Sequence, residues 1–128
     1  EGDGIIMGLL LTEIVAESGT TLSELVSDLL AEVGPAVYAR RDQRLNRPVA
    51  KEKMVEYLIN NAPKEIGGVK VDQVSTKDGV KYILDDNSWL LIRPSGTEPV
   101  LRVYAEGRTD EMLRALLAYG ESVATNVV

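Results

Sequence analysis

The first third of the chain has the apolar spacing of two helices. Residues 5–17 are apolar on nearly all sides, and Asp3 in front of them can cap a helix. Residues 22–33 carry an amphipathic stripe with a period of three to four, and the preceding Thr21-Leu-Ser-Glu24 fits a capping box. Helices this apolar are typical of elements buried against a partner, so we expect their partner, a sheet, to lie upstream of them.

The next segment, residues 36–48, reads "AVYARRDQRLNRP" and has a different character. It contains four arginines and few large apolar residues, and it ends in a proline. This composition predicts a short strand followed by a solvated linker, and we assign the hinge to residues 41–48. The four arginines could instead form an anion patch. We prefer the linker because no glycine or hydroxyl-rich turn accompanies them.

From residue 50 onward the pattern predicts a helix, four strands and a helix. The first helix covers about 50–61, and the last runs from Thr109 to about 126. Between them, four strand-like runs are separated by short turns: "GVKVDQV", "VKYILD", "WLLIR" and "VLRVYAE". Short connections favour an antiparallel sheet with both helices on one face, an α+β fold. The predicted domains are therefore 1–40, the 41–48 linker and 49–128.

Composition restricts the chemistry available to this chain. Its 128 residues include 14 basic and 20 acidic side chains, a net charge of −6, which argues against nucleic acid or an anionic membrane as a partner. With no cysteine and no histidine, the chain lacks the groups for disulfides, thiolate catalysis, a serine–histidine relay or a zinc site. The acidic pair Asp85-Asp86 precedes Asn87 and is interpreted as a turn rather than as metal ligands.

The stretch "IRPSGTEPVLRVYAEG", residues 92–107, has the components of an anion site. Arg93 supplies a guanidinium fork, and Ser95 and Thr97 supply hydroxyl donors. Gly96 permits a positive φ and close approach of the backbone to a ligand. Prolines on both sides stiffen the turn, which lowers the ordering cost of binding.

Two further charged residues of this stretch, Arg102 and Glu98, lie close to the turn. Arg102 lies just past the turn on the returning strand and is expected to point to the same place as Arg93. Glu98 would repel an anion, unless it orients one of the arginines or accepts a hydrogen bond from a sugar hydroxyl. A stiff hairpin with two exposed arginines is an equally good interpretation of the residues alone.

The string "RPSGTEPVLRVYAEG" closely resembles the phosphate-binding signature of the α-D-phosphohexomutases. The segment "DGIIMGLLLTEIVAESGTTLSELV" is similar to the helical end of their third domain, and the helix–strands–helix order is similar to their fourth. The resemblance implies phosphate contacts at Arg93, Ser95, Gly96 and Thr97, with Arg102 as a second arginine. It also implies a cytoplasmic enzyme that interconverts hexose 1-phosphate and hexose 6-phosphate through a phosphoserine and a bisphosphorylated intermediate.

The same resemblance assigns the nucleophilic serine, the Mg²⁺-binding aspartate loop and the sugar-reading loop to segments that this chain does not contain. The chain is therefore expected to bind the phosphate of a phosphosugar beside upstream domains of the same enzyme, with no metal, nucleic acid or membrane bound. Alone, it is expected to be inactive. The alternatives are a stand-alone phosphate-binding or regulatory module and a structural interaction domain.

Overall fold

A computed structural model describes residues 2–45, 49–96 and 98–126. The chain divides into two compact units, residues 1–35 and residues 36–128.

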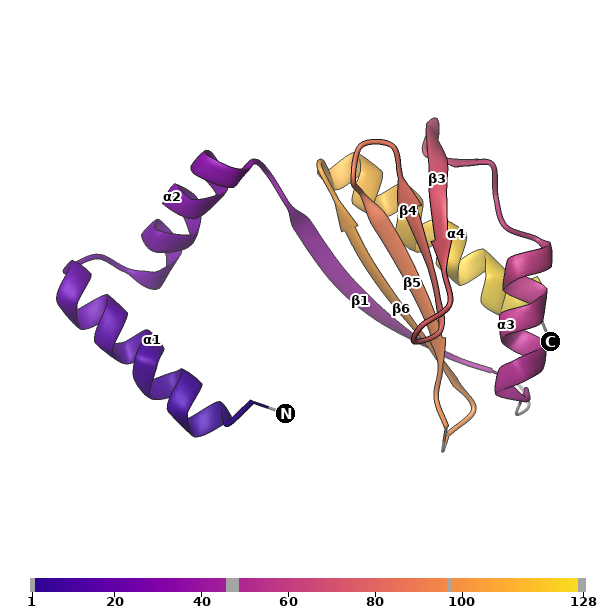
Figure 1. Ribbon diagram of the computed structural model, residues 1–128, viewed down its shortest axis with the longest axis horizontal. Coiled ribbons are helices and arrows are strands. Elements are labelled where there is room, and N and C mark those ends of the chain that lie inside the picture. Colours follow the sequence, from indigo (N-terminus) through magenta and orange to yellow (C-terminus); the bar gives the residue numbers. More distant parts are fainter. Residues whose placement is uncertain (1, 46–48, 97, 127–128) are drawn as a thin grey trace. The chain divides into compact units, whose positions relative to one another are not determined.

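The first unit consists of two capped helices, α1 (Gly4–Ser18) and α2 (Leu22–Val33) (Figure 1). The Asp3 carboxylate accepts hydrogen bonds from the backbone N–H groups of Ile5 and Ile6, at 2.9 and 3.2 Å. Thr21 and Glu24 form the reciprocal bonds of a capping box at the start of α2. Both predicted helix starts are thus confirmed, because each has the side chain that satisfies otherwise unpaired N–H groups.

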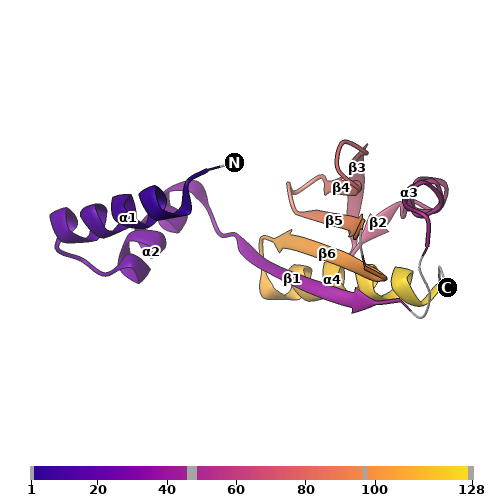
Figure 2. The same ribbon diagram turned by 90° about the horizontal axis from the view of Figure 1, so that it is seen from below.

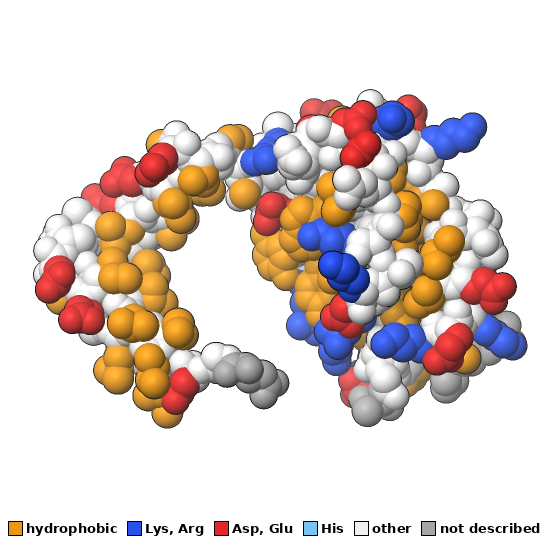
Figure 3. All heavy atoms as spheres, viewed as in Figure 1, with side chains coloured by type: hydrophobic (Ala, Val, Ile, Leu, Met, Phe, Trp, Pro, Cys, Tyr) orange, Lys and Arg blue, Asp and Glu red, His pale blue; other side chains and the backbone are white. Residues whose placement is uncertain are grey.

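Apolar side chains of this unit remain on its surface. Neither helix has a buried residue in the described structure, and Ile5 is 77% exposed. Hydrophobic side chains gather along both helices in the space-filling view (Figure 3). Their membership of an upstream α/β domain stays a prediction.

No single helix among the described residues is long and apolar enough to cross a membrane. Helices α1 and α2 together would satisfy length and composition, but they are bent by 87° at their junction.

The second unit is an antiparallel sheet with two helices. The strands are β1 (Val37–Arg44), β2 (Glu65–Ile66), β3 (Val69–Ser75), β4 (Val80–Leu84), β5 (Trp89–Pro94) and β6 (Val100–Gly107). The helices are α3 (Lys51–Asn60) and α4 (Asp110–Asn126). Strand order across the sheet is β1-β6-β5-β4-β3-β2. The α+β class is confirmed, but the predicted four-stranded sheet is wrong, since the described sheet has six strands.

The two additional strands lie at the edges of the sheet. Strand β1 pairs along its whole length with β6, so residues 41–44 of the predicted linker are part of a strand. Its inward positions hold only modest apolar residues such as Val37 and Ala39, and this hid the alternation among the arginines. Strand β2 has two residues and is too short for any periodicity to reveal.

The core lies between one face of the sheet and the helices. Along β4, Val80, Tyr82 and Leu84 alternate with less buried residues, as the sequence predicted. Leu58 of α3 and Leu116 of α4 belong to the same buried cluster, and α4 runs along the sheet in Figure 2. The other face of the sheet is therefore free of helices within the described unit.

The acidic pair Asp85-Asp86 is part of the turn between β4 and β5. The Asp86 carboxylate accepts hydrogen bonds from the backbone N–H and the hydroxyl of Ser88, at 2.8 and 2.9 Å. Asn87 takes the left-handed conformation, with φ of 64°. These bonds confirm the turn, with Asp86 as its acceptor.

Candidate anion site on the β5–β6 hairpin

The two arginines of the hairpin face each other across neighbouring strands. Arg93 of β5 and Arg102 of β6 are directly paired in the ladder. Their neighbours along the strands, Ile92 and Val103, point into the core and are fully buried. Because side chains alternate between faces, both arginines lie on the face without helices. The structure thus brings Arg93 and Arg102 together, as the sequence predicted.

Carboxylates flank this arginine pair on both sides. Asp42 of β1 is the ladder partner of Arg102. Asp78, in the β3–β4 turn, has its Oδ1 3.2 Å from Nε of Arg93. Across this face the charges therefore run negative, positive, positive, negative. Like charges directly opposite each other are unfavourable in a sheet, and a bound anion would relieve that repulsion.

Asp42 already has a strong partner on its own strand. Its two carboxylate oxygens each lie 2.7 Å from a guanidinium nitrogen of Arg40. Arg40 holds the pKa of the Asp42 carboxyl below its ordinary value, and the charge of Arg102 contributes to the same lowering. The main interaction of the Asp42 carboxylate is thus its ion pair with Arg40, and its electrostatic interaction with Arg102 is weaker.

Arg102 has an unmatched hydrogen-bond donor. Its Nε atom is buried and has no hydrogen-bond partner among the described residues. A buried donor without a partner is unfavourable, by about 1–3 kcal/mol, and more when the group is charged. This feature distinguishes Arg102 from an arginine that merely extends into solvent.

The turn that joins the two strands is held at its base by the backbone. Ser95 N–H donates to Val100 O at 2.8 Å, and Val100 N–H donates to Glu98 O at 2.7 Å. Gly96 is exposed, and a Cβ added there would meet nothing within 4 Å, so its surroundings are open to a ligand. Its φ lies outside the left-handed region, so the positive φ that glycine permits is not used here. Thr97 lies outside the described residues.

The carboxylate that contacts Arg93 belongs to Asp78 and not to Glu98, the residue considered from the sequence. Glu98 is exposed, and no ion pair joins it to Arg93 or Arg102 within the described chain. Asp78 contacts Arg93 instead. From the sequence, Asp78 is half of a turn with Gly79, and nothing in one sequence indicates that this turn lies beside β5.

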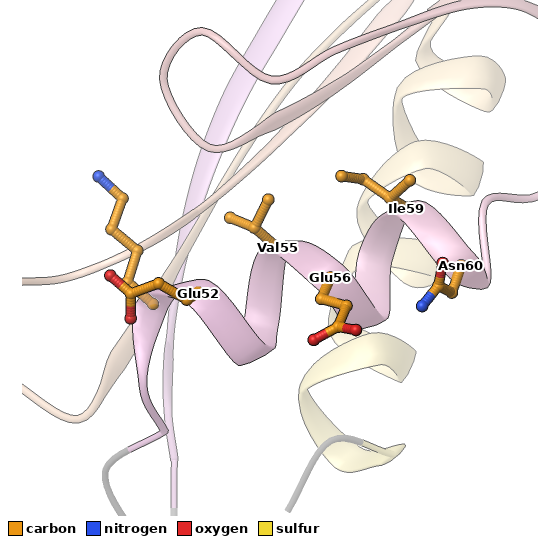
Figure 4. A pocket seen from close by; sticks show the side chains of 6 residues that line it. Glu52, Val55, Glu56, Ile59 and Asn60 are labelled. Atoms are coloured by element: carbon orange, nitrogen blue, oxygen red, sulfur yellow. The ribbon is translucent and has the colours of Figure 1, made fainter.

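Two cavities lie near α3, and they differ in their relation to the hairpin. One, of about 260 Å³, is bounded by Ser95 and Gly96 on one side and by Ala50 and Lys51 at the start of α3 on another. A larger one, of about 480 Å³, runs along α3 and is lined by Val55 and Ile59 among acidic neighbours (Figure 4). No residue of the hairpin lines the larger cavity, whereas Glu98 of the hairpin lines the smaller one together with Ser95 and Gly96.

Metal ligands do not converge in the part of the chain that the structure describes. No group of three or more acidic residues there could hold a metal ion. The donors that the hairpin offers, guanidinium, hydroxyl and N–H groups, suit an anion instead.

The fold and this hairpin define an α+β domain with a candidate anion site on its β5–β6 hairpin. Residues 45–119 match the family model described as "Phosphoglucomutase/phosphomannomutase, C-terminal domain". Residues 1–33 match the alpha/beta/alpha domain III of the same family. The chain belongs to the phosphoglucomutase/phosphomannomutase family, and the resemblance found in the sequence is confirmed.

Relatives with several activities in their names are similar over almost the whole chain. A probable phosphoglucosamine mutase of Methanothermobacter thermautotrophicus is 33% identical over 98% of this chain and 26% of its own length. A phosphoglucomutase/phosphomannomutase of Thermococcus kodakarensis is 35% identical over 92% of this chain and 23% of its own length. A phosphopentomutase of the same organism is 32% identical over 97% of this chain and 26% of its own length. The chain thus spans about a quarter of the length of these relatives.

Proposed function

We propose that the β5–β6 hairpin binds the phosphate group of a phosphosugar for a phosphohexomutase. In this proposal Arg93 and Arg102 provide the charge, while Ser95, Gly96 and Thr97 surround the phosphate oxygens from the turn. The observation that carries it is the direct cross-strand pairing of the two arginines on the face without helices. Family membership supports it, because the named relatives are mutases of phosphorylated sugars.

In the complete enzyme this phosphate-binding site (the phosphate grip) would orient the substrate and would not itself break bonds. The hairpin would hold the phosphate that is not being transferred, so that the other end of the sugar meets a phosphoserine outside this chain. Holding a substrate in a reactive geometry can supply a large part of a rate enhancement. Mg²⁺ would be held by residues outside this chain and would stabilise charge on the transferring phosphoryl group.

The remaining parts of the proposal follow from the same assignment. The upstream domains of the enzyme would be the partners of this chain, which by itself would bind phosphate without turnover. We propose a cytoplasmic enzyme, in keeping with an intracellular supply of sugar phosphates.

Titration of the chain with glucose 6-phosphate tests phosphate binding. Amide resonances of Arg93, Ser95, Gly96 and Arg102 should shift in ¹H–¹⁵N NMR spectra, while glucose without phosphate should leave them in place. Unchanged resonances in millimolar glucose 6-phosphate would exclude the proposed site.

The substitution Arg93→Lys sharpens this test. Lysine keeps the charge but loses the bidentate fork, so we expect binding about tenfold weaker, the loss of one charge-assisted hydrogen bond. Stability should barely change, because the Arg93 side chain is 43% exposed and its ion pair lies on the surface. The matched control is Arg41→Lys, at an exposed position of β1 whose side chain points toward α4 rather than toward the site. Equal affinity of both variants would contradict the role of Arg93.

A further inference from the structure

The β3–β4 turn lies directly against the backbone of β5 at Arg93. A Cβ added to Gly79 would be 2.5 Å from the carbonyl oxygen of Ile92 and 3.1 Å from Cα of Arg93. Gly79 also has a φ of 84°, which side chains other than glycine rarely adopt. Both the close approach and the positive φ thus require glycine at position 79. The packing of this turn against β5 places the preceding residue, Asp78, next to Arg93.

The contact between Asp78 and Arg93 involves the Nε atom of the guanidinium group. The ion pair joins Oδ1 of Asp78 and Nε of Arg93, which lie 3.2 Å apart. A guanidinium group has five N–H donors, so an Asp78 carboxylate oxygen at Nε leaves further donors for a phosphate.

Stability alone does not account for this ion pair. Both side chains are about half exposed, Arg93 at 43% and Asp78 at 56%. Exposed ion pairs contribute little to folding, typically 0–1 kcal/mol. A negative charge beside an anion site also weakens anion binding by simple electrostatics. A role that accounts for the arrangement is to hold Arg93 in one orientation.

We infer that Asp78 is a positioning residue, which holds the Arg93 guanidinium through Nε so that its terminal fork faces the phosphate. This inference rests on the proposed phosphate grip and adds to it a residue from a different hairpin. A side chain as flexible as arginine loses conformational freedom when it binds, and prior immobilisation removes part of that loss. Asp78 would immobilise Arg93 before binding, although its own negative charge repels the phosphate.

The two effects of Asp78 predict opposite results for the variant Asp78→Asn. If Asp78 is only a nearby negative charge, asparagine removes repulsion, and glucose 6-phosphate should bind more tightly. If Asp78 positions Arg93, asparagine should bind the same probe about three- to tenfold more weakly, because Arg93 must then be ordered during binding. The sign of the change therefore separates the two explanations.

The experiment compares dissociation constants for glucose 6-phosphate in the wild-type chain, Asp78→Asn and the control Asp72→Asn. Asp72 is an exposed aspartate of neighbouring strand β3, and no ion pair joins it to Arg93 among the described residues. Asp72→Asn makes the same charge change and should bind as tightly as wild type or slightly more tightly. In an Arg93→Lys background, Asp78→Asn should no longer weaken binding.

The Nε–Hε resonance of Arg93 provides a readout that needs no ligand. It should shift in Asp78→Asn and stay in place in Asp72→Asn, with equal melting temperatures. Wild-type binding combined with equal or tighter binding by Asp78→Asn would overturn the inference but leave the phosphate grip intact. An Arg93 resonance that does not respond to Asp78→Asn would overturn it as well. Absence of binding by the wild-type chain would overturn both proposals.

Discussion

At the scale of single residues, Tyr82 joins the sheet to the end of a helix. Its hydroxyl donates to the carbonyl oxygen of Leu58 at 2.8 Å, and the whole side chain is buried. Leu58 belongs to the last turn of α3, where carbonyl groups have no partner within the helix. The Tyr82 hydroxyl satisfies one of these carbonyls from the sheet.

Because of this environment, the stability of the second unit should decrease at alkaline pH. Burial, followed by the nearby Tyr119, raises the pKa of Tyr82 above its ordinary value of 10.0. In the unfolded chain Tyr82 loses its proton near pH 10, whereas in the folded chain it keeps it. The unfolded state then binds fewer protons, so the free energy of unfolding should fall as pH rises above 10, by up to about 1.4 kcal/mol per pH unit.

The variant Tyr82→Phe isolates this effect. At pH 7 it should lower the free energy of unfolding by about 1–2 kcal/mol, because the Leu58 carbonyl loses its partner. Above pH 10 its stability should fall less steeply than that of wild type. Urea denaturation at pH 7, 9, 10 and 11 measures both quantities. Parallel pH profiles for the two proteins would contradict the assignment.

The residues of the candidate site were predictable to different degrees. Arg93 and Arg102 could be placed together because a tight hairpin with a short turn dictates which strand positions meet. Asp78 could not, since its contact with Arg93 depends on how the β3–β4 turn packs against β5. Gly96 permits a positive φ, but its residue type alone does not decide whether the turn uses one, and the structure has none there.

At the scale of elements, a glycine within α4 sets how closely the helix lies on the sheet. A Cβ added to Gly120 would come within 2.4 Å of a Val103 methyl carbon on β6. The sequence showed only that glycine weakens a helix, by about 1 kcal/mol relative to alanine. The close approach explains why it is present.

Gly120→Ala should therefore destabilise the protein despite the better helix propensity of alanine. We expect a loss of about 1–3 kcal/mol, the usual cost of overpacking a close contact. Val103→Ala supplies the matched test, because it removes the methyl groups that would clash. In that background Gly120→Ala should be neutral or stabilising. Thermal or urea unfolding of the four proteins completes the cycle, and equal costs in both backgrounds would contradict the explanation.

Elements with strong periodicity were the ones that could be predicted. The alternation of Val80, Tyr82 and Leu84, and the caps at Asp3 and Thr21, are local signals, and the structure has the elements they indicate. Strand β1 was partly assigned to a linker because an edge strand faces solvent and can carry arginines without a regular apolar face. What makes it a strand is pairing with β6, more than fifty residues later in the sequence.

At the scale of the whole molecule, the pairing of β1 changes where a joint between the two units should lie. The chain divides between Pro35 and Ala36, and β1 follows at once. Every residue of β1 has a partner on β6, so residues 37–44 are tied to the second unit. We therefore predict that relative motion, if the units move independently, occurs at residues 34–36 and not at 41–48.

Backbone ¹⁵N relaxation of the chain tests this prediction. Amides of residues 4–33 and of residues 51–126 should give different rotational correlation times, because two units joined by a few residues tumble partly independently. Amides of β1 should follow the second group, since their ladder bonds would have to break for β1 to move with α1 and α2. One common correlation time would contradict independent motion. Relaxation of β1 with the first group would return the joint to residues 41–48, and binding of glucose 6-phosphate at the hairpin would be unaffected by either result.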